Sequence, residues 1–150
     1  MRKKTIEDYV EIIYVLGGNN GRVRTSQIAN ALSLSPASVT EVLQKLAEEE
    51  YIQYRPYNGA MLLEKGQRLA METKKRHDTL KKVLMLLGVE ESIAEEDACK
   101  IEHIVHPETM RRIRKFVEFA SNRPEAPLFL ENFEWFVQTG KRRVCPREKK

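Results

Sequence analysis

A helix-start signal placed just after a tight turn is the feature that most constrains the fold of this chain. Ser35 is followed by Pro36, and this pair is typical of the first residues of a helix. The serine hydroxyl caps a free backbone N–H, and proline lacks the N–H that would have no partner at the first helical position. A shorter helix is expected from about Ser26 to Leu32, with Thr25 as its N-cap, and the turn Ser33-Leu34-Ser35 would join the two.

The second of these helices is expected to run to about Glu49, with one apolar and one polar face. Its apolar side chains recur at i, i+3, i+4 and i+7, the spacing of a helix that packs on one side: Val39, Val42, Leu43 and Leu46. The residues that would face outward are small or polar: Ala37, Ser38, Glu41, Gln44 and Lys45. Two helices with a three-residue turn, the second opening on hydroxyl side chains, are typical of a DNA-reading helix-turn-helix.

A β-hairpin is predicted directly after this helix pair. Residues Tyr51–Arg55 and Ala60–Leu63 favour strands, and Pro56-Tyr57-Asn58-Gly59 separates them, with Asn-Gly as the expected turn. Short helix pairs also occur in proteins that bind no DNA, but a two-stranded wing beside the pair favours DNA binding. Glu41 repels phosphate, so its expected partner is a cytosine amino group. The residues expected to reach phosphates or base edges are Pro36, Ala37, Ser38, Thr40, Glu41, Arg55 and Tyr57.

Helices are also expected on both sides of this segment. Residues Thr5–Leu16 carry an apolar stripe that leaves Glu7, Asp8 and Glu11 elsewhere on the surface, and a Gly- and Asn-rich loop follows. After the hairpin, a long helix is expected from Glu64 to Gly88. Three shorter helices are expected after it, at residues 93–105, 107–121 and 126–139.

The predicted fold class is therefore mainly α. An N-terminal winged helix-turn-helix domain with a short β-hairpin wing is expected at residues 1–72, and an all-α dimerisation and metal-binding domain at 73–140. The basic segment 141–150 is expected to fray as a solvated tail. Two or three short helices rarely bury two apolar stripes alone, so a dimer interface is the expected completion. The stripes are Ile113, Phe116, Val117, Ala120 and Phe129, Phe133, Phe136.

Charge and cysteine content agree with a DNA-binding protein of the cytoplasm. The formal net charge is +4 and the pI is about 9.1, which favours a polyanionic partner because Lys and Arg release counterions from phosphates. An apolar run of ~18 residues is missing, so neither a membrane span nor a secretory signal is expected. Cys99 and Cys145 are too few for a disulfide scaffold and suit a reducing compartment.

Six side chains are candidate metal ligands. Cys99, Glu102 and His103 have the spacing i, i+3, i+4, which predicts a thiolate, a carboxylate and an imidazole on one helical face. The pair Asp8 and Glu11 repeats the i, i+3 spacing, and His77 lies within the long predicted helix. A solvated polar surface is the alternative for each of these residues taken alone, and the Cys-x-x-Glu-His run is the stronger signal for a metal site. His106, beside Pro107, is expected to be a loop or cap residue.

These residues together resemble the iron- and manganese-dependent repressors of the diphtheria-toxin repressor and manganese transport regulator family. The resemblance spans about residues 5 to 120. It rests on Thr5–Tyr14, Ser35–Thr40, the hairpin around Tyr54 and Tyr57–Gly59, His77 after Lys75-Arg76, and Ile101–His103.

The resemblance implies a homodimer of the two-domain type, without the SH3-like third domain of longer members, in which metal ions tie the first helix to the second half. It assigns Asp8, Glu11, His77, Cys99, Glu102 and His103 as ligands. Asp8 and Glu11 are similar to the manganese branch and Cys99 to the iron branch, so the implied effector is Fe²⁺ or Mn²⁺, with Zn²⁺, Co²⁺ or Ni²⁺ as possible substitutes. Lys81 and Glu95 depart from the iron branch's other site, which would be remodelled or absent.

The function implied is a metal-dependent repressor that controls metal homeostasis genes. Metal would act as corepressor by shifting the population toward one spacing of the two recognition helices. Half-sites ~34 Å apart would make the operator near-palindromic, and metal affinity would fall in acid as the ligands protonate. Two alternatives stay open at this point: a winged-helix regulator that ignores metal, and a metalloenzyme with Glu102 as general base.

Overall fold

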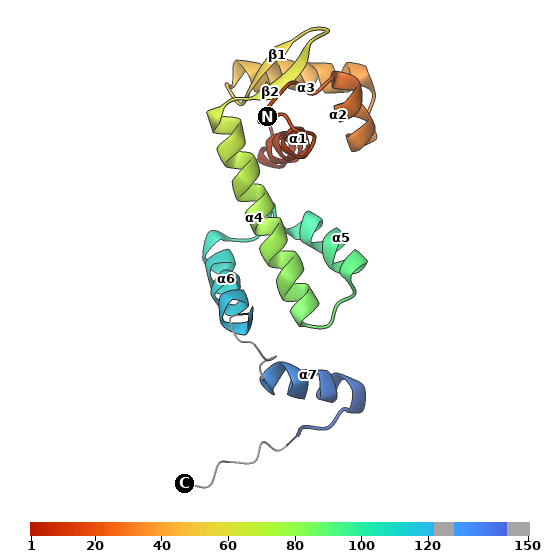
Figure 1. Cartoon of the computed structure of the whole chain (residues 1–150), viewed down its shortest axis with the longest axis vertical. Helices are drawn as coiled ribbons and strands as arrows, with labels where there is room; N and C mark the ends of the chain where they lie inside the picture. Colours follow the sequence, from red (N-terminus) through yellow and green to blue (C-terminus); the bar gives the residue numbers. More distant parts are fainter. Residues whose placement is uncertain (122–127, 144–150) are drawn as a thin grey trace. The chain divides into compact units, whose positions relative to one another are not determined.

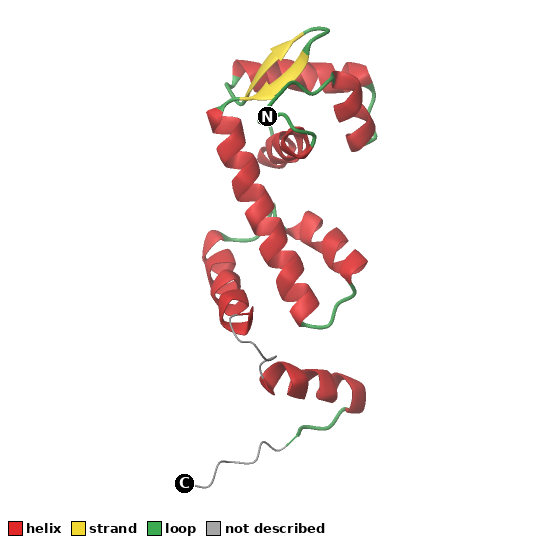
Figure 2. Ribbon diagram, in the orientation of Figure 1, coloured by secondary structure: helices red, strands yellow, loops and turns green. Residues whose placement is uncertain are grey.

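The computed structural model of the chain describes residues 1–121 and 128–143. Two compact units share the chain, one from Met1 to Lys75 and one from Arg76 to Lys150, and each is described by itself. Helices dominate both units, and the first contains a two-stranded sheet (Figures 1 and 2). The predicted mainly α fold class with a winged helix-turn-helix is confirmed. Across the described part of the chain, none of the helices is both long and apolar enough to span a membrane.

The helix-turn-helix consists of α2 (Thr25–Leu32) and α3 (Pro36–Glu48), preceded by α1 (Lys3–Val15). Ser35 is the N-cap of α3, and its hydroxyl accepts a hydrogen bond of 3.2 Å from the Ser38 N–H, as the Ser-Pro pair predicts. The predicted cap of α2 was wrong. Thr25 is already the first helical residue, and the Arg24 N–H donates instead to the side-chain oxygen of Gln27 at 2.9 Å.

The core of the first unit combines the apolar stripes of these three helices with Val23, Ile52, Ala60, Leu62 and Ala70. Its fully buried side chains include Ile13 of α1, Ile28 of α2 and Leu43 of α3. The outward residues of α3 are exposed as predicted, so its polar face is open to a ligand. Glu7 corrects the expected surface of α1, because its side chain is fully buried with the Lys3 ammonium 3.8 Å away.

The hairpin pairs β1 (Ile52–Arg55) with β2 (Gly59–Leu62) in antiparallel register. Because Arg55 pairs with Gly59, the connecting loop is residues 56–58, and Gly59 belongs to β2 and not to the predicted turn. Left-handed backbone angles fall on Tyr57 (φ 66°) and Gly59 (φ 88°) rather than on Asn58. Val23 forms an additional bridge to β2, exchanging two backbone hydrogen bonds of 2.8 and 2.9 Å with Ala60.

The second unit contains the C-terminal part of α4 (Glu64–Leu86), followed by α5 (Glu91–Ile101), α6 (Pro107–Ser121) and α7 (Leu128–Thr139). Gly88 ends the long helix with a positive φ of 85°, as expected. The small core of the second unit contains Leu80 of α4, Ala98 of α5 and Met110 of α6. Phe129 of α7 lies against α6, with ring centroids 6.0 Å from Phe116 and 6.1 Å from Phe119. The expected helix start at Ala126, Cys145 and tail residues 144–150 lie outside the described residues.

The C-terminal end of α5 differs from the prediction, and the difference changes where a predicted metal ligand lies. The helix expected to reach Val105 ends at Ile101, and Glu102 is its C-cap. The Glu102 N–H still donates to the carbonyl of Ala98 at 3.0 Å, whereas Ile104 and Val105 both bond back to the carbonyl of Ile101. His103 therefore lies in a tight turn after the helix and not on the regular helix that the sequence pattern predicted.

Candidate DNA-binding surface and metal centre

A groove of about 490 Å³ lies in the first unit between the helix-turn-helix and the hairpin. It is bordered by the N-terminal residues of two helices and by the wing, so three segments that could each contact nucleic acid share one surface. It contains Pro36, Thr40 and Tyr57 from the predicted set. The residues that line it are Arg24, Thr25, Ser26, Pro36, Thr40, Tyr54, Pro56, Tyr57 and Gly59.

At the start of α3, some hydrogen-bonding groups already have a partner within the helix, and other residues are exposed to solvent. Ala37, Ser38 and Glu41 are exposed. The Thr40 hydroxyl donates to the Pro36 carbonyl oxygen at 2.8 Å, so within this helix it retains acceptor capacity but no proton for a phosphate oxygen. Thr40 is therefore suited to an apolar contact through its methyl group or to accepting a base N–H. The Ser38 hydroxyl lies 2.9 Å from the Ser35 hydroxyl, and it can donate to phosphate when Ser35 is the donor of that pair.

The wing extends two predicted residues into solvent. Tyr57 at the tip is fully exposed, and Arg55 at the end of β1 is exposed as well. Arg22 stabilises the hairpin, because its guanidinium donates to the Gly59 carbonyl at 3.3 Å and to the side-chain oxygen of Gln53. The wing is thus held by side-chain and backbone bonds, while its tip remains available.

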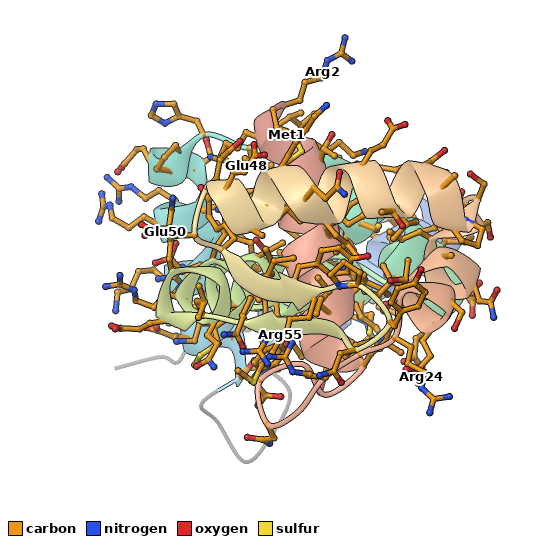
Figure 3. All side chains as sticks on the ribbon, turned by 90° about the horizontal axis from the view of Figure 1, so that it is seen from above. Met1, Arg2, Arg24, Glu48, Glu50 and Arg55 are labelled. Carbon is orange, nitrogen blue, oxygen red and sulfur yellow. The ribbon has the colours of Figure 1, made fainter. Side chains whose placement is uncertain are left out.

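Arg24 is a candidate contact that the sequence interpretation missed. It precedes α2, lines the groove and is exposed, and Figure 3 shows its side chain extending away from the ribbon. The signal for it was present, because a basic residue just before a helix that opens with Thr25 and Ser26 adds charge to free helical N–H groups. The predicted DNA contacts at a helix start were confined to α3.

The second unit brings three of the predicted metal ligands together around one buried carboxylate. Oε2 of Glu102 lies 3.0 Å from Nδ1 of His77, and its Oε1 lies 3.3 Å from Nε2 of His103. The side chains of Glu102 and His103 are 1% and 2% exposed, and that of His77 is 12% exposed. A buried carboxylate between two imidazoles is costly unless a proton or a cation balances its charge.

The ionic contacts continue from His77 to the surface. Its Nε2 lies 3.1 Å from Oε1 of Glu95, and the Lys81 ammonium lies 2.9 Å from both Glu95 and Glu91. Hydrogen bonds to Glu91 and then to Glu95 hold the pKa of Lys81 above its ordinary value. The hydrogen bond from Lys81 lowers the pKa of Glu95 in turn, so Glu95 is an anion near neutral pH.

The remaining predicted ligands are placed differently. Cys99 is exposed on α5, in contrast to the buried side chains of Glu102 and His103. Asp8 and Glu11 are half-buried on α1, in the first unit, and their convergence with the others on one ion stays a prediction. Within the described residues, no group of three or more His, Cys, Asp or Glu side chains is spaced to hold an ion. The Glu102 side chain is instead in direct contact with those of His77 and His103.

The donors at Glu102 nevertheless fit a divalent transition metal by their chemistry. Two imidazole nitrogens and a carboxylate are ligands shared by Mn²⁺, Fe²⁺ and Zn²⁺, and they are buried with charge that a cation would balance. His106 does not belong to this group, because its Nδ1 accepts the Glu108 N–H at 3.2 Å at the start of α6. Its predicted role as a cap residue is confirmed.

Apolar side chains of α6 and α7 form an exposed surface in the second unit. Exposure is 58% for Phe119, 38% for Phe133, 44% for Phe136 and 59% for Val137, and α7 has no buried residue. A hollow of about 370 Å³ on α7 is lined by Phe129, Asn132, Phe133, Phe136, Arg142 and Arg143. Contiguous apolar surface of this kind marks interaction sites in proteins that are otherwise soluble.

Comparison with known families covers most of the chain. Residues 1–60 match the family described as iron dependent repressor, N-terminal DNA binding domain. Residues 63–127 match the family described as iron dependent repressor, metal binding and dimerisation domain. The first match contains the groove and wing, and the second contains His77, Cys99, Glu102 and His103. These families are repressors and not enzymes, which sets aside the metalloenzyme alternative.

Solved structures of metal regulators are similar to this chain. The manganese regulator SloR is 31% identical with a TM-score of 0.65, over 76% of this chain and 54% of its own. A manganese-dependent transcriptional repressor in complex with manganese is 26% identical with a TM-score of 0.68, over 79% and 55%. ScaR with bound Zn²⁺ is 27% identical with a TM-score of 0.64, over 81% and 55%.

The chain spans about half the length of these three structures. Its two matched segments nevertheless account for the DNA-binding half and the metal-binding and dimerisation half in order. On this evidence, the chain belongs to the family of iron-dependent repressors.

Proposed function

We propose that this protein is a metal-dependent DNA-binding repressor that senses Fe²⁺ or Mn²⁺ and controls genes of metal homeostasis in the cytoplasm. The observation that carries the proposal is the buried Glu102 carboxylate in contact with His77 and His103, inside the segment that matches a metal-binding and dimerisation domain. The groove between α3 and the wing, inside the segment that matches a DNA-binding domain, supports the other half of the proposal.

The proposed ligands come from both units. Glu102, His103 and His77 would hold the ion, together with Cys99 from α5 and with Asp8 and Glu11 from α1. A bound divalent cation would place positive charge beside the Glu102 carboxylate. Carboxylates suit Mn²⁺ and a thiolate favours Fe²⁺, Co²⁺, Ni²⁺ or Zn²⁺. The exposure of Cys99 supports a carboxylate- and imidazole-based site in which the thiolate is a variable member.

We propose that α3 enters the major groove of DNA, with Pro36, Ala37, Ser38, Thr40 and Glu41 near base edges and phosphates, while Arg55 and Tyr57 of the wing contact the backbone. Ser38 would donate to phosphate, and Thr40 would contact bases through its methyl group or remaining lone pairs. Arg24 at the start of α2 joins this set, because it borders the same groove.

A homodimer would place two such surfaces on one DNA duplex. The apolar surface of Phe119, Phe133, Phe136 and Val137 supports assembly through α6 and α7. Two recognition helices in a two-fold dimer read half-sites about one helical turn apart, ~34 Å, which predicts a near-palindromic operator.

Joint ligation gives the mechanism of control. Because Asp8 and Glu11 belong to the DNA-binding unit and the other four ligands to the second unit, metal occupancy and the position of the DNA-binding units are linked. The dimer arrangement that completes the ligand set would be the one that fits both half-sites, so metal and DNA would each raise the affinity for the other.

Variants of the buried cluster test this proposal. Glu102→Gln and His103→Ala should reduce the metal-dependent gain in affinity for the protein's own promoter at least tenfold, equal to ~1.4 kcal/mol, while metal-independent binding stays within about twofold. Asp97→Asn on α5, half-buried and outside the ligand set, is the matched control. DNA affinity that does not change with metal in the wild type, the variants or the control would favour a winged-helix regulator that ignores metal. An equal metal-dependent gain in all of them would show that Glu102 and His103 are not the ligands.

A further inference from the structure

Both ring nitrogens of His77 are in contact with carboxylates. Nδ1 lies 3.0 Å from Oε2 of Glu102, and Nε2 lies 3.1 Å from Oε1 of Glu95. A neutral imidazole has one N–H donor and one acceptor nitrogen, and only the unprotonated nitrogen binds a metal. The side chains around the ring therefore determine which nitrogen His77 offers to an ion.

The two carboxylates differ in a way that decides between the nitrogens. Glu102 is buried, contacts His103 and belongs to the proposed ligand set. Glu95 is 53% exposed, and its other oxygen is bound by the Lys81 ammonium at 2.9 Å. Glu95 is thus an anion that Lys81 holds in place, and an ionised carboxylate can accept a charge-assisted hydrogen bond from an N–H at Nε2.

Lys81 holds Glu95 through a compact ionic arrangement between α4 and α5. His77 and Lys81 are four residues apart on α4, and Glu91 and Glu95 are four residues apart on α5, so each pair lies on one helical face. The single ammonium lies 2.9 Å from both carboxylates. With Lys81 between them, Glu91 and Glu95 already have a cation and do not need a metal ion.

We propose that Glu95, held by Lys81, is a positioning residue that keeps the proton of His77 on Nε2 and leaves Nδ1, on the side of Glu102, to bind the metal. This inference rests on the proposed function, because it assigns His77 as a ligand. A carboxylate that accepts the second N–H of a metal-binding histidine fixes both the tautomer and the orientation of the ring. In this chain Lys81 supplies the fixed charge that keeps that carboxylate in place.

Two measurements on the full-length, metal-free protein test the proposal. The first is the tautomer of His77, read from its ring ¹⁵N chemical shifts at about pH 8, where an ordinary histidine is neutral. We expect Nε2 to carry a proton in the wild type and to lose part of it in Glu95→Ala. An unprotonated Nε2 in the wild type would overturn the proposal without any reference to metal.

The second measurement is the affinity for Co²⁺, followed by its visible absorption under anaerobic conditions. Glu95→Ala should weaken binding ~10–100-fold, as loss of such a partner does elsewhere. Glu95→Gln should recover most of it, because the amide oxygen still accepts from Nε2–H, and Lys81→Met should give an intermediate loss. Glu96→Ala is the matched control, an exposed neighbour whose carboxylate pairs with Lys100 instead.

The outcomes distinguish a failure of the positioning role of Glu95 from a failure of the proposed function. If the wild type binds Co²⁺ and Glu95→Ala binds it equally well, the positioning role is refuted and the proposed function survives. If Glu95→Gln is as weak as Glu95→Ala, a hydrogen bond to Nε2 is not the cause and the proposal is also refuted. If the wild type binds no Co²⁺ or other divalent ion, the proposed function itself fails, while the tautomer measurement still tests the effect of Glu95 on His77.

Discussion

The backbone of Val23 passes so close to Gly59 that a Cβ atom at residue 59 would lie 2.2 Å from the Val23 carbonyl oxygen. This approach lets Val23 bridge to β2 and ties the wing to the segment before α2. Gly59 also has a positive φ of 88°, a conformation that residues with a Cβ rarely adopt. Gly59 is therefore required by the wing for two independent reasons.

Gly59→Ala should destabilise the first unit by about 2–4 kcal/mol, because backbone strain adds to a clash with backbone atoms that cannot turn away. Chemical denaturation of the metal-free protein measures the change. Gly21→Ala is the matched control, since no atom lies within 4 Å of the added Cβ, and it should change stability by less than about 0.5 kcal/mol. Equal effects of the two substitutions would contradict this account of the wing.

Arg55→Ala should weaken binding to operator and non-operator DNA by similar factors and reduce the slope of log affinity against log salt by about 1. The reason is that an exposed wing arginine neutralises a phosphate rather than reading a base. Arg68→Ala, an exposed arginine on α4 next to Glu64, should leave the slope unchanged. Fluorescence anisotropy at several salt concentrations measures both, and a loss confined to operator DNA would instead assign Arg55 to base reading.

Phe133→Glu should shift the protein from dimer toward monomer, because it places a charge within the exposed apolar surface of α6 and α7. Sedimentation velocity over a range of protein concentrations measures the dissociation constant, which we expect to rise at least tenfold. Gln138→Glu adds the same charge to α7 at an exposed residue already bonded to Glu134, and should have a smaller effect. An unchanged dimer in Phe133→Glu would show that the interface lies elsewhere.

Two helix-start glutamates give the second unit a defined response to acid. Hydrogen bonds from Ser92 lower the pKa of Glu90 below its ordinary value of 4.5, and those from Arg111, then Arg112, lower the pKa of Glu108. A lowered folded pKa means that the stabilisation is fully present above about pH 4.5 and is lost as the pH falls through the folded value. The double variant Glu90→Gln/Glu108→Gln should therefore be less stable than the wild type near neutral pH and should approach it in acid. A stability difference that stays constant down to about pH 3, measured by thermal unfolding, would contradict this assignment.

Local signals predicted the helix-turn-helix well. The Ser35–Pro36 start and the apolar spacing of α3 depend on neighbours within one or two turns, so the sequence contains all the information that these features need. The error at the hairpin turn arose, in contrast, from a long-range contact. Gly59 looked like half of an Asn-Gly turn, whereas its conformation serves the passage of Val23, which lies far away in the sequence.

The predicted metal ligands show the same contrast between local sequence signals and long-range packing. The run Cys99, Glu102, His103 predicted metal chemistry, but helical spacing alone could not show that Cys99 is exposed while the other two are buried. The end of α5 at Ile101 depends on how Glu102 and the following turn pack in the second unit. The link from Lys81 through Glu95 to His77 joins two helices, so it could not be derived from the spacing within either one.

The most direct test of metal-dependent repression is the affinity of the wild-type protein for its own promoter DNA, measured by fluorescence anisotropy without metal and with anaerobic Fe²⁺, Mn²⁺ or Zn²⁺ in parallel. We expect at least one ion to tighten binding tenfold or more, equal to ~1.4 kcal/mol of coupling, and the most effective ion identifies the effector. Tight binding that is the same in all four conditions would contradict the corepressor mechanism and leave only the DNA-binding function of the first unit.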